Sequence, residues 1–239
     1  MKITIVTVCF NAQDTIKDTV DSVLAQRYED LEYLIMDGQS TDQTLEYLEP
    51  YRKNPYISIF SEPDDGLYNA MNKGIMKASG EYILFLNSGD YFADSNVLKD
   101  VSRHLTGDLI YGNVIRRYKD YERLEKYPGR WTPFLLMLQG RMMSHQVIFT
   151  RTEVMKKYGF DESFKITADY DFMVRTLHDR CRYAYVDRTI SIVENEEGIS
   201  SNEDNLKQMR AEDDRSLKTN FPGWFYLLYP VKLIKRNIK

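Results

Sequence analysis

The sequence predicts an α/β protein: a doubly wound, mostly parallel sheet in the first half, followed by a less regular second half. In the first 90 residues, short apolar runs alternate four times with segments of helical spacing. Such alternation is typical of a parallel sheet with helices on its faces. The first run, residues 3–8, is β-branched like a buried strand. With 239 residues, of which 43% are hydrophobic, the chain can bury a core without a disulfide or a metal.

The expected elements of the first half follow one another closely. After the strand at residues 3–8, Asp14 is placed to cap a helix. The apolar face of that helix is expected to comprise Ile16, Val20, Val23 and Leu24. Further strands are expected at residues 31–36, 57–60 and 82–86, separated by helices at residues 44–51 and 67–77. Polar clusters stand at or shortly after these strand ends, where α/β sheets bind ligands.

The second half shows weaker periodicity. Strands are expected at residues 108–115 and 146–149, and helices at residues 152–158, 169–179 and 202–218. Residues 118–130 are polar and aromatic, which indicates a loop or a hairpin. We therefore expect one domain over residues 1–220, divided near residue 115, and a separate tail at residues 221–239.

Charge, hydropathy and cysteine usage narrow the function classes. The net charge is -4, whereas duplex-binding domains carry a basic excess, so no nucleic-acid partner is expected. The sequence has no run of 18 apolar residues and no signal-peptide pattern at its start. Cys9 and Cys181 match no metal or redox spacing and fit a reducing compartment. A cytoplasmic protein is the expectation.

Two familiar phosphate-binding motifs and the hydrolase nucleophile elbow are absent, which leaves carboxylates at strand ends as the candidates for chemistry. Asp37 ends the second strand, where it can accept hydrogen bonds from a ribose hydroxyl or a base N–H. The alternative is a turn and helix cap, but Ser40 or Asp42 could supply that cap alone. Asp90 follows the strand at residues 82–86 and suits Mg²⁺ or Mn²⁺ that also binds phosphates, although it could be only a turn residue.

The third helix opens with another polar cluster. Gly66 permits close approach of the backbone to a ligand, and Asn72 shares a helix face with Tyr68 and Ile75. A simple helix start is the alternative interpretation of this segment.

Taken in order, these segments resemble the motifs of a family 2 glycosyltransferase of the bacterial polysaccharide-biosynthesis type. The matching stretches are residues 7–12 (TVCFNA), 22–26 (SVLAQ), 37–44 (DGQSTDQT), 65–74 (DGLYNAMNKG), 80–82 (GEY), 86–90 (LNSGD), 145–146 (HQ), 159–162 (GFDE) and 168–171 (ADYD). Each stretch is short, but their shared order and spacing are specific. The resemblance implies a GT-A fold, which is a Rossmann-like doubly wound sheet, with a donor half at about 1–115 and an acceptor half at about 116–220.

The resemblance also implies a role for each matching residue. The donor, a nucleotide sugar expected to be UDP-linked, would be bound by Thr7, Cys9, Asn11, Asp37, Gly38, Asp65, Gly66, Asn72, Asn87, Ser88 and Gly89. Asp169 would be the general base, and Asp90 would hold Mn²⁺ or Mg²⁺ on the leaving diphosphate. The acceptor or the diphosphate would be contacted by His145, Asp161, Glu162 and Asp171.

The sequence departs from the family pattern at several positions. Asn87 replaces the first carboxylate of the Asp-x-Asp motif, which moves the expected metal ligand to Asp90. Ala168 replaces the glutamate before Asp169, so that Asp171 could compete as the base. Elsewhere, methionine at position 71 replaces a frequent arginine, and one phosphate or base contact is lost.

The predicted function is inverting, metal-dependent transfer of a sugar to a hydroxyl of a glycan or a polyprenyl-diphosphate-linked acceptor, in surface-polysaccharide synthesis. The alternative is a non-catalytic module of the same fold that binds a sugar nucleotide or a glycan. Loss of the first Asp-x-Asp carboxylate favours this alternative, whereas retention of Asp90 and Asp169 opposes it. A nucleotidyltransferase is a further rival, but its Gly- and basic-rich loop is missing after the first strand.

The last segment, residues 221–239, contains five aromatic and four basic side chains and no acidic one. This composition suits an anionic membrane surface, on which the protein would be peripheral at the inner face of the cell membrane. A terminal helix that packs on the domain, or a homodimer contact, is the alternative.

Overall fold

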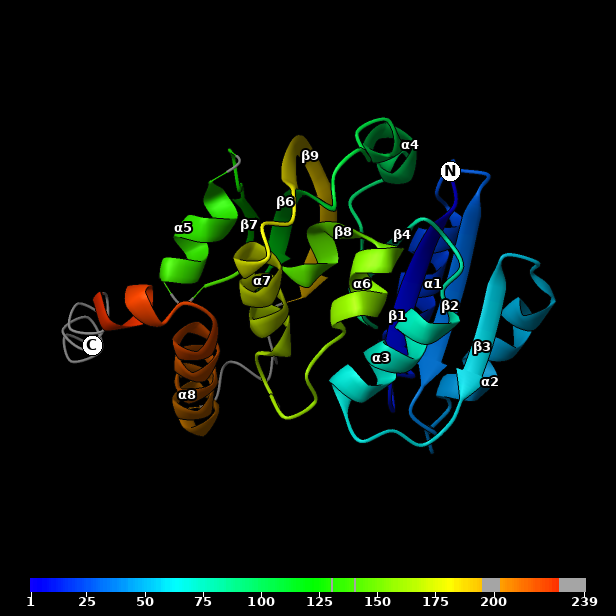
Figure 1. Ribbon diagram of the computed structural model, residues 1–239. Helices are drawn as coiled ribbons and strands as arrows, with labels where there is room; N and C mark the ends of the chain where they lie inside the picture. Colours follow the sequence, from blue (N-terminus) through cyan, green and yellow to red (C-terminus); the bar gives the residue numbers. More distant parts are fainter. Residues whose placement is uncertain (130, 140, 195–202, 228–239) are drawn as a thin grey trace.

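The computed structural model describes residues 1–129, 131–139, 141–194 and 203–227, and a mixed sheet with helices on both faces forms its centre (Figure 1). The strands are β1 (Ile3–Cys9), β2 (Leu31–Asp37), β3 (Ile57–Ser61), β4 (Tyr82–Phe85), β5 (Tyr91–Phe92), β6 (Leu109–Arg117), β7 (Glu122–Glu125), β8 (Ile148–Arg151) and β9 (Tyr183–Glu194). The helices are α1 (Ile16–Leu24), α2 (Thr44–Leu48), α3 (Leu67–Lys77), α4 (Val97–Ser102), α5 (Thr132–Leu138), α6 (Thr152–Tyr158), α7 (Ala168–His178) and α8 (Glu203–Asn220). Two 3-10 turns, η1 (Glu49–Lys53) and η2 (His145–Val147), complete the described elements.

The first half is the expected parallel sheet. Neighbouring strands follow the order β3-β2-β1-β4-β8-β6-β9-β5, and β7 pairs with β6. β1 runs parallel to β2 and β4, and β2 runs parallel to β3. Side chains of β1 alternate between two cores: Ile3 and Ile5 pack on the face with α1, and Val6 and Val8 on the face with α3. The predicted doubly wound α/β fold is therefore confirmed.

The second half mixes strand directions. β8 is antiparallel to both β4 and β6, whereas β6 and β9 are parallel, with breaks in register between Tyr111 and Val114. At this break a Cβ on Gly112 would lie 2.5 Å from the Arg188 carbonyl oxygen, so glycine allows the close approach of β9. β9 was not predicted, because Asp187 and Arg188 interrupt its apolar pattern.

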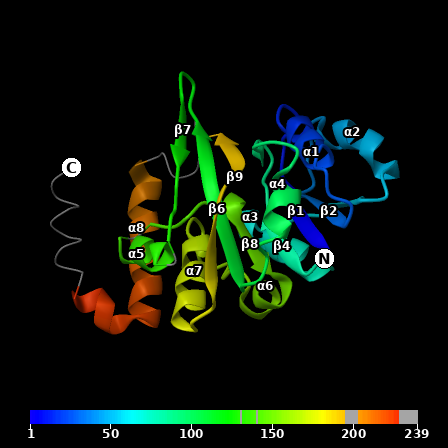
Figure 2. The same cartoon turned by 90° about the horizontal axis from the view of Figure 1, so that it is seen from above.

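Most predicted elements match the structure within a few residues, including helices at residues 67–77 and 152–158. At residues 118–130 the hairpin alternative is correct: β6 and β7 form it, and it projects from the body (Figure 2). The predicted cap at Asp14 is wrong. α1 begins at Ile16 after Thr15 with no side-chain cap, and the Ala12 carbonyl accepts both of their amides. β5, α4 and α5 were not predicted.

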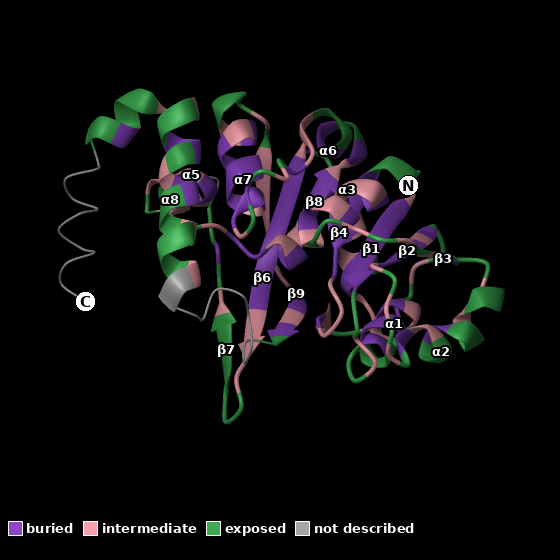
Figure 3. Ribbon diagram, turned by 90° about the horizontal axis from the view of Figure 1, so that it is seen from below, coloured by how far each residue is buried: buried purple, intermediate pink, exposed green. Residues whose placement is uncertain are grey.

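Buried residues run along the sheet strands, whereas the outer faces of α8 and β7 are exposed (Figure 3). α8 packs beside α7, and its Leu217 joins the main core together with Phe225. The start of the predicted tail is therefore part of the body. Residues 228–239, which carry its four basic side chains, lie outside the described residues. Within the described ranges, no helix combines the length and the apolar character needed to cross a bilayer.

Candidate active site

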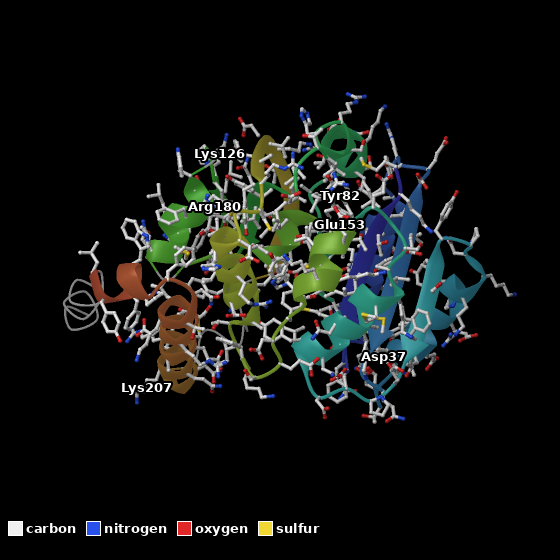
Figure 4. All side chains as sticks on the ribbon, in the orientation of Figure 1. Asp37, Tyr82, Lys126, Glu153, Arg180 and Lys207 are labelled. Atoms are coloured by element: carbon white, nitrogen blue, oxygen red, sulfur yellow. The ribbon has the colours of Figure 1, made fainter. Side chains whose placement is uncertain are left out.

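Asp37 closes β2 at the edge where the parallel strands end (Figure 4). It is 2% exposed. Its carboxylate accepts hydrogen bonds from the Ser40 amide at 3.1 Å and from the Ser61 hydroxyl at 2.6 Å. Burial raises the pKa of the Cys9 thiol, which stays protonated and lies 3.8 Å from the same carboxylate. Donors from both neighbouring strands, β1 and β3, therefore hold Asp37 in place.

The loop after β1 is bonded to the loop after β2. Asn11 has a left-handed backbone with φ of 48°, which asparagine tolerates better than most residues. Its Oδ1 accepts a hydrogen bond from the Thr41 amide at 2.9 Å. In the second loop, the Asp42 carboxylate accepts the Thr44 amide at 2.9 Å, at the start of α2. Asp42 therefore serves the start of this helix, and Asp37 is not required there.

The loop after β3 reaches the same rim. The Gly38 amide donates to the Cys9 carbonyl at 2.9 Å, and a Cβ on Gly38 would collide with the Asp64 carboxylate. Asp65 and Gly66 follow at the exposed start of α3. Gly66 has a φ of 113°, a conformation that favours glycine. Loops after three parallel strands thus converge, as the topology predicted.

Two predicted donor residues lie beneath this rim. Thr7 is fully buried, and its hydroxyl donates to the Leu86 carbonyl at 2.6 Å. Asn72 accepts the Phe160 amide at 2.9 Å and donates to Glu162 at 2.8 Å. Hydrogen bonds from α3, that of Asn72 foremost, hold the pKa of Glu162 below its usual range. Thr7 therefore supports the site from within, whereas Asn72 and Glu162 are partly exposed and bonded to each other.

The turn after β4 is hydrogen-bonded to α1 and to Thr15, the residue before it. Gly89 has a φ of 93°, and its amide donates to the Thr19 hydroxyl at 3.0 Å. The Ser88 hydroxyl lies 2.8 Å from that of Thr15. Gly89 also borders a cavity of about 490 Å³, which Tyr91 and residues of α1, β6 and β9 line. The predicted site shares only this turn with the cavity.

Asp90 ends this turn with its side chain facing inward. It is 5% exposed, and its Oδ2 accepts a hydrogen bond from the Gln146 amide at 2.7 Å. Burial raises the pKa of Asp90 to about 6, although the Gln146 hydrogen bond opposes the shift. A cation beside Asp90 would favour its charged form.

The described residues include no group of three or more His, Cys, Asp or Glu side chains that could hold a metal ion. Mg²⁺ in substrate sites usually takes one or two carboxylates and completes its shell with phosphates and water. A site built on Asp90 fits this substrate-completed type and does not fit a preformed cage.

Asp169 lies in the first turn of α7 and is joined to the β4 turn through a histidine. Its carboxylate lies 3.3 Å from the Tyr68 hydroxyl, accepts the Tyr170 amide at 2.8 Å, and lies 3.2 Å from His145 Nδ1. The other ring nitrogen, Nε2, lies 3.0 Å from Asn87 Nδ2. Because a carboxylate only accepts, His145 Nδ1 carries a proton and donates it to Asp169.

The two other acidic candidates near α7 are in different environments. Asp171 is 3% exposed, and its oxygens accept hydrogen bonds from Arg175 Nε and the Ser216 hydroxyl, both at 2.6 Å. Asp171 is therefore engaged in a buried ion pair and is not free to compete as a base. Asp161 is exposed and accepts the Ser163 amide at 2.9 Å.

Sequence reasoning missed two members of this network, Tyr68 and Gln146. Tyr68 was noted only as a neighbour of Asn72 on a helix face, and Gln146 only as part of a motif. The sequence offered a hint for each residue. Tyr68 lies two residues after Gly66 in the matching stretch at residues 65–74, and Gln146 directly follows His145 in the stretch at residues 145–146.

The chain is also similar to known proteins. A family model described as "Glycosyl transferase family 2" matches residues 4–164. An uncharacterized glycosyltransferase of Mycobacterium tuberculosis is 33% identical over 180 residues, which cover 72% of this chain and 68% of the relative. A PGL/p-HBAD biosynthesis glycosyltransferase of Mycobacterium bovis is 31% identical over 163 residues, which cover 65% of this chain and 62% of the relative.

Among solved structures, S. aureus TarS 1-349 in complex with UDP-GlcNAc is similar, with a TM-score of 0.73 and 21% identity. The similarity covers 92% of this chain and 68% of that chain. At this identity it shows the fold alone. The chain spans about two thirds of the length of each of these relatives.

Proposed function

The chain belongs to glycosyl transferase family 2. From this premise we propose that it transfers the sugar of a UDP-sugar donor to a hydroxyl of a glycan or lipid-linked acceptor, with inversion at the anomeric carbon. One observation carries the proposal: a continuous hydrogen-bonded path joins Asp169 through His145 to Asn87, in the β4 turn that also holds Asp90. A transferase needs a base near the acceptor and a charged group near the leaving diphosphate, and this path connects the two.

In the proposed reaction, Asp169 accepts the proton of the acceptor hydroxyl as its oxygen attacks the anomeric carbon of the donor. The new carbon–oxygen bond forms as the bond to the diphosphate oxygen breaks, and UDP leaves from the opposite face. The configuration at the anomeric carbon is therefore inverted. The His145 ring proton, donated to Asp169, keeps the carboxylate oriented.

The donor side is proposed to be the rim formed by Asn11, Asp37, Gly38, Asp65 and Gly66. Asp37 is buried among fixed donors and would shape the rim, and Asp65 adds an exposed carboxylate. We propose Mn²⁺ or Mg²⁺ as the cofactor, held by Asp90. When bound, the ion would stabilise charge on the leaving diphosphate as a Lewis acid.

The donor and the product are proposed by analogy with the relatives. TarS, which shares the fold, is described with UDP-GlcNAc bound, which supports a UDP-sugar donor. A relative named for PGL/p-HBAD biosynthesis supports an acceptor in envelope glycan or glycolipid assembly.

A thermal-shift screen of UDP-, GDP- and dTDP-sugars, with and without Mn²⁺, tests the donor and the metal together. A ligand at about 100 times its Kd stabilises a protein by roughly 2.7 kcal/mol. The proposal expects the largest shift with a UDP-sugar and Mn²⁺. An equal shift for all three nucleotides, or one that ignores Mn²⁺, contradicts it.

A second candidate function is a non-catalytic module that binds the donor without turnover. The observation that favours it is Asn87, which stands where the family carries a carboxylate. Release of UDP from the best donor, followed with and without a panel of soluble acceptors, separates the two. Binding without any UDP release would support the module.

A further inference from the structure

A buried carboxylate on α8, Glu212, faces the backbone that precedes the proposed base. Glu212 is 8% exposed. Its oxygens accept hydrogen bonds from the consecutive amides of Lys165, Ile166 and Thr167, each at 3.0 Å. Consecutive amides that converge on one point form a site of the kind that binds anions. Here a side chain of the protein itself is the anion.

Other residues of α8 hold the same region along one helix face. Gln208 lies one turn before Glu212 and donates to its Oε1 at 2.9 Å. Ser216 lies one turn after it and donates to Asp171 at 2.6 Å. Residues four apart share a helix face, so a stripe of three polar side chains fixes the start of α7.

The contact extends to Asp169 through a shared peptide. The Thr167 amide is bound by Glu212, and the Ile166 carbonyl of the same peptide group accepts the Tyr68 hydroxyl at 2.7 Å. The same hydroxyl lies 3.3 Å from Asp169. Rotation of this peptide would therefore displace Tyr68 and the first turn of α7 together.

We infer that Glu212 is a positioning residue for the proposed base: its carboxylate fixes residues 165–167 and so holds Asp169 toward the acceptor. The inference rests on the proposed role of Asp169. Glu212 lies outside residues 4–164, the part that the family model matches. The catalytic unit therefore extends to α8.

The charge of Glu212 is essential to this role. Burial opposes its ionisation, but the hydrogen bonds from Lys165, Gln208, Ile166 and Thr167 hold the pKa of Glu212 below its usual range. In Glu212→Gln, the new NH₂ group would face backbone N–H donors, and at least one amide would lose its partner.

Hydrogen exchange tests the first step without any substrate. In Glu212→Gln, the amides of residues 165–167 should exchange about 10-fold faster, the effect of one lost hydrogen bond. Glu153→Gln is the matched control, because it removes the same charge from a side chain of α6 that is 77% exposed (Figure 4). Unchanged exchange at residues 165–167 in Glu212→Gln would overturn the inference.

Nitrogen-15 spectra of the histidines test the second step, again without substrate. The chain has three histidines, and the Nδ1–H of His145 reports on the position of Asp169. Glu212→Gln should shift this signal or change the tautomer, whereas the signals of His104 and His178 should stay. A wild-type His145 signal in this variant means that Asp169 has not moved, and the inference fails.

Kinetics test the consequence. Glu212→Gln should lower kcat on the order of 10-fold and leave the donor KM within about 2-fold, because only the base moves. Gln208→Ala, at an exposed position, should give a smaller loss in the same direction, and it provides the test if Glu212→Gln does not fold. Parallel loss of kcat and donor affinity would indicate a general structural role and overturn the inference.

If the wild type transfers no sugar, the proposed function fails. Hydrogen exchange and the histidine spectra would then still decide whether Glu212 positions Asp169.

Discussion

The donor rim and the base are held by different parts of the fold. On the rim, Asp37 is bound by Ser40 in its own loop and by Ser61 on the neighbouring strand β3. Around the base, Asp169 is bound by Tyr68 of α3, 101 residues away, and by His145 of η2, 24 residues away. The rim is therefore fixed within the parallel sheet and its loops, whereas the base is oriented by the packing of α3 and η2 against α7.

Variants in the two regions should therefore change different kinetic properties. Substitutions on the rim should change donor affinity and spare the chemical step. Substitutions around the base, even distant in sequence, should change turnover and spare donor affinity.

The largest effect is expected from Asp169→Asn. Asparagine keeps the shape of the side chain but cannot take the acceptor proton, so turnover should fall on the order of 10²–10⁴-fold. Donor affinity, measured by calorimetry, should be unchanged.

Glu153→Gln is the matched control for the base, because it removes a carboxylate of α6 that is 77% exposed and lies outside the proposed site. It should retain nearly full turnover. A fall in donor affinity that parallels the loss in Asp169→Asn would break the contrast between rim and base.

Asp90→Asn should lower turnover on the order of 10²-fold and remove the dependence of UDP binding on Mn²⁺. It should also stabilise the free protein at neutral pH. Burial raises the folded pKa of Asp90 to about 6, above the ordinary aspartate value of 3.8. A group with a raised folded pKa favours folding while protonated, and this contribution is lost as pH rises through 6.

At about pH 7.5 the charged Asp90 therefore costs about 3 kcal/mol, which the asparagine variant avoids. Denaturant unfolding at about pH 4 and pH 7.5 measures this difference, which should be small at the lower pH. Equal stability of the two proteins at pH 7.5 would contradict the raised pKa of Asp90, and intact Mn²⁺ dependence of UDP binding would contradict its role as the metal ligand.

His145→Gln should lower turnover about 10-fold, since a hydrogen bond to a charged group contributes about 1.5–3 kcal/mol. Donor affinity should stay within about 2-fold, because His145 contacts Asp169 and Asn87 and no residue of the rim. His178→Gln is the control, since His178 is exposed and bonded to Asp179 on the far end of α7. A loss of donor affinity in His145→Gln would instead assign the histidine to the diphosphate.

The same contrast explains how much could be predicted from sequence. The parallel sheet and the rim were predicted because their signals are local: apolar runs, and polar residues at each strand end. β9 was missed because Asp187 and Arg188 obscure its pattern, although it pairs with β6 over most of its length. Glu212 was missed because a glutamate on a charged helix gives no local signal. Its role depends on the packing of α8 against residues 165–167.

Gly38→Ala should affect the rim and spare the base. A Cβ at this position would collide with the Asp64 carboxylate, so the Asp64 side chain would have to move and the shape of the rim would change. The donor KM should rise about 5- to 10-fold with kcat nearly unchanged, as steady-state kinetics over donor concentration would measure. A matching fall in kcat would show that the rim and the base are coupled more tightly than their contacts indicate.

The smallest effect on turnover is expected from removal of the chain after Leu227. A cut after Asn220 would be a poor test, because it would also remove Phe225, which is 7% exposed and packs in the main core. The cut after Leu227 keeps this contact and removes residues 228–239 with their four basic side chains. If these dock on anionic lipid, each contributes about 1 kcal/mol. The truncated protein should therefore no longer sediment with anionic vesicles, and it should keep its turnover on a short soluble acceptor.

High salt should release the full-length protein from the vesicles in part, because surface charge is screened over about 8 Å at physiological ionic strength. A full-length protein that ignores anionic vesicles would favour the alternative, in which the segment packs on the domain or joins two copies of the chain.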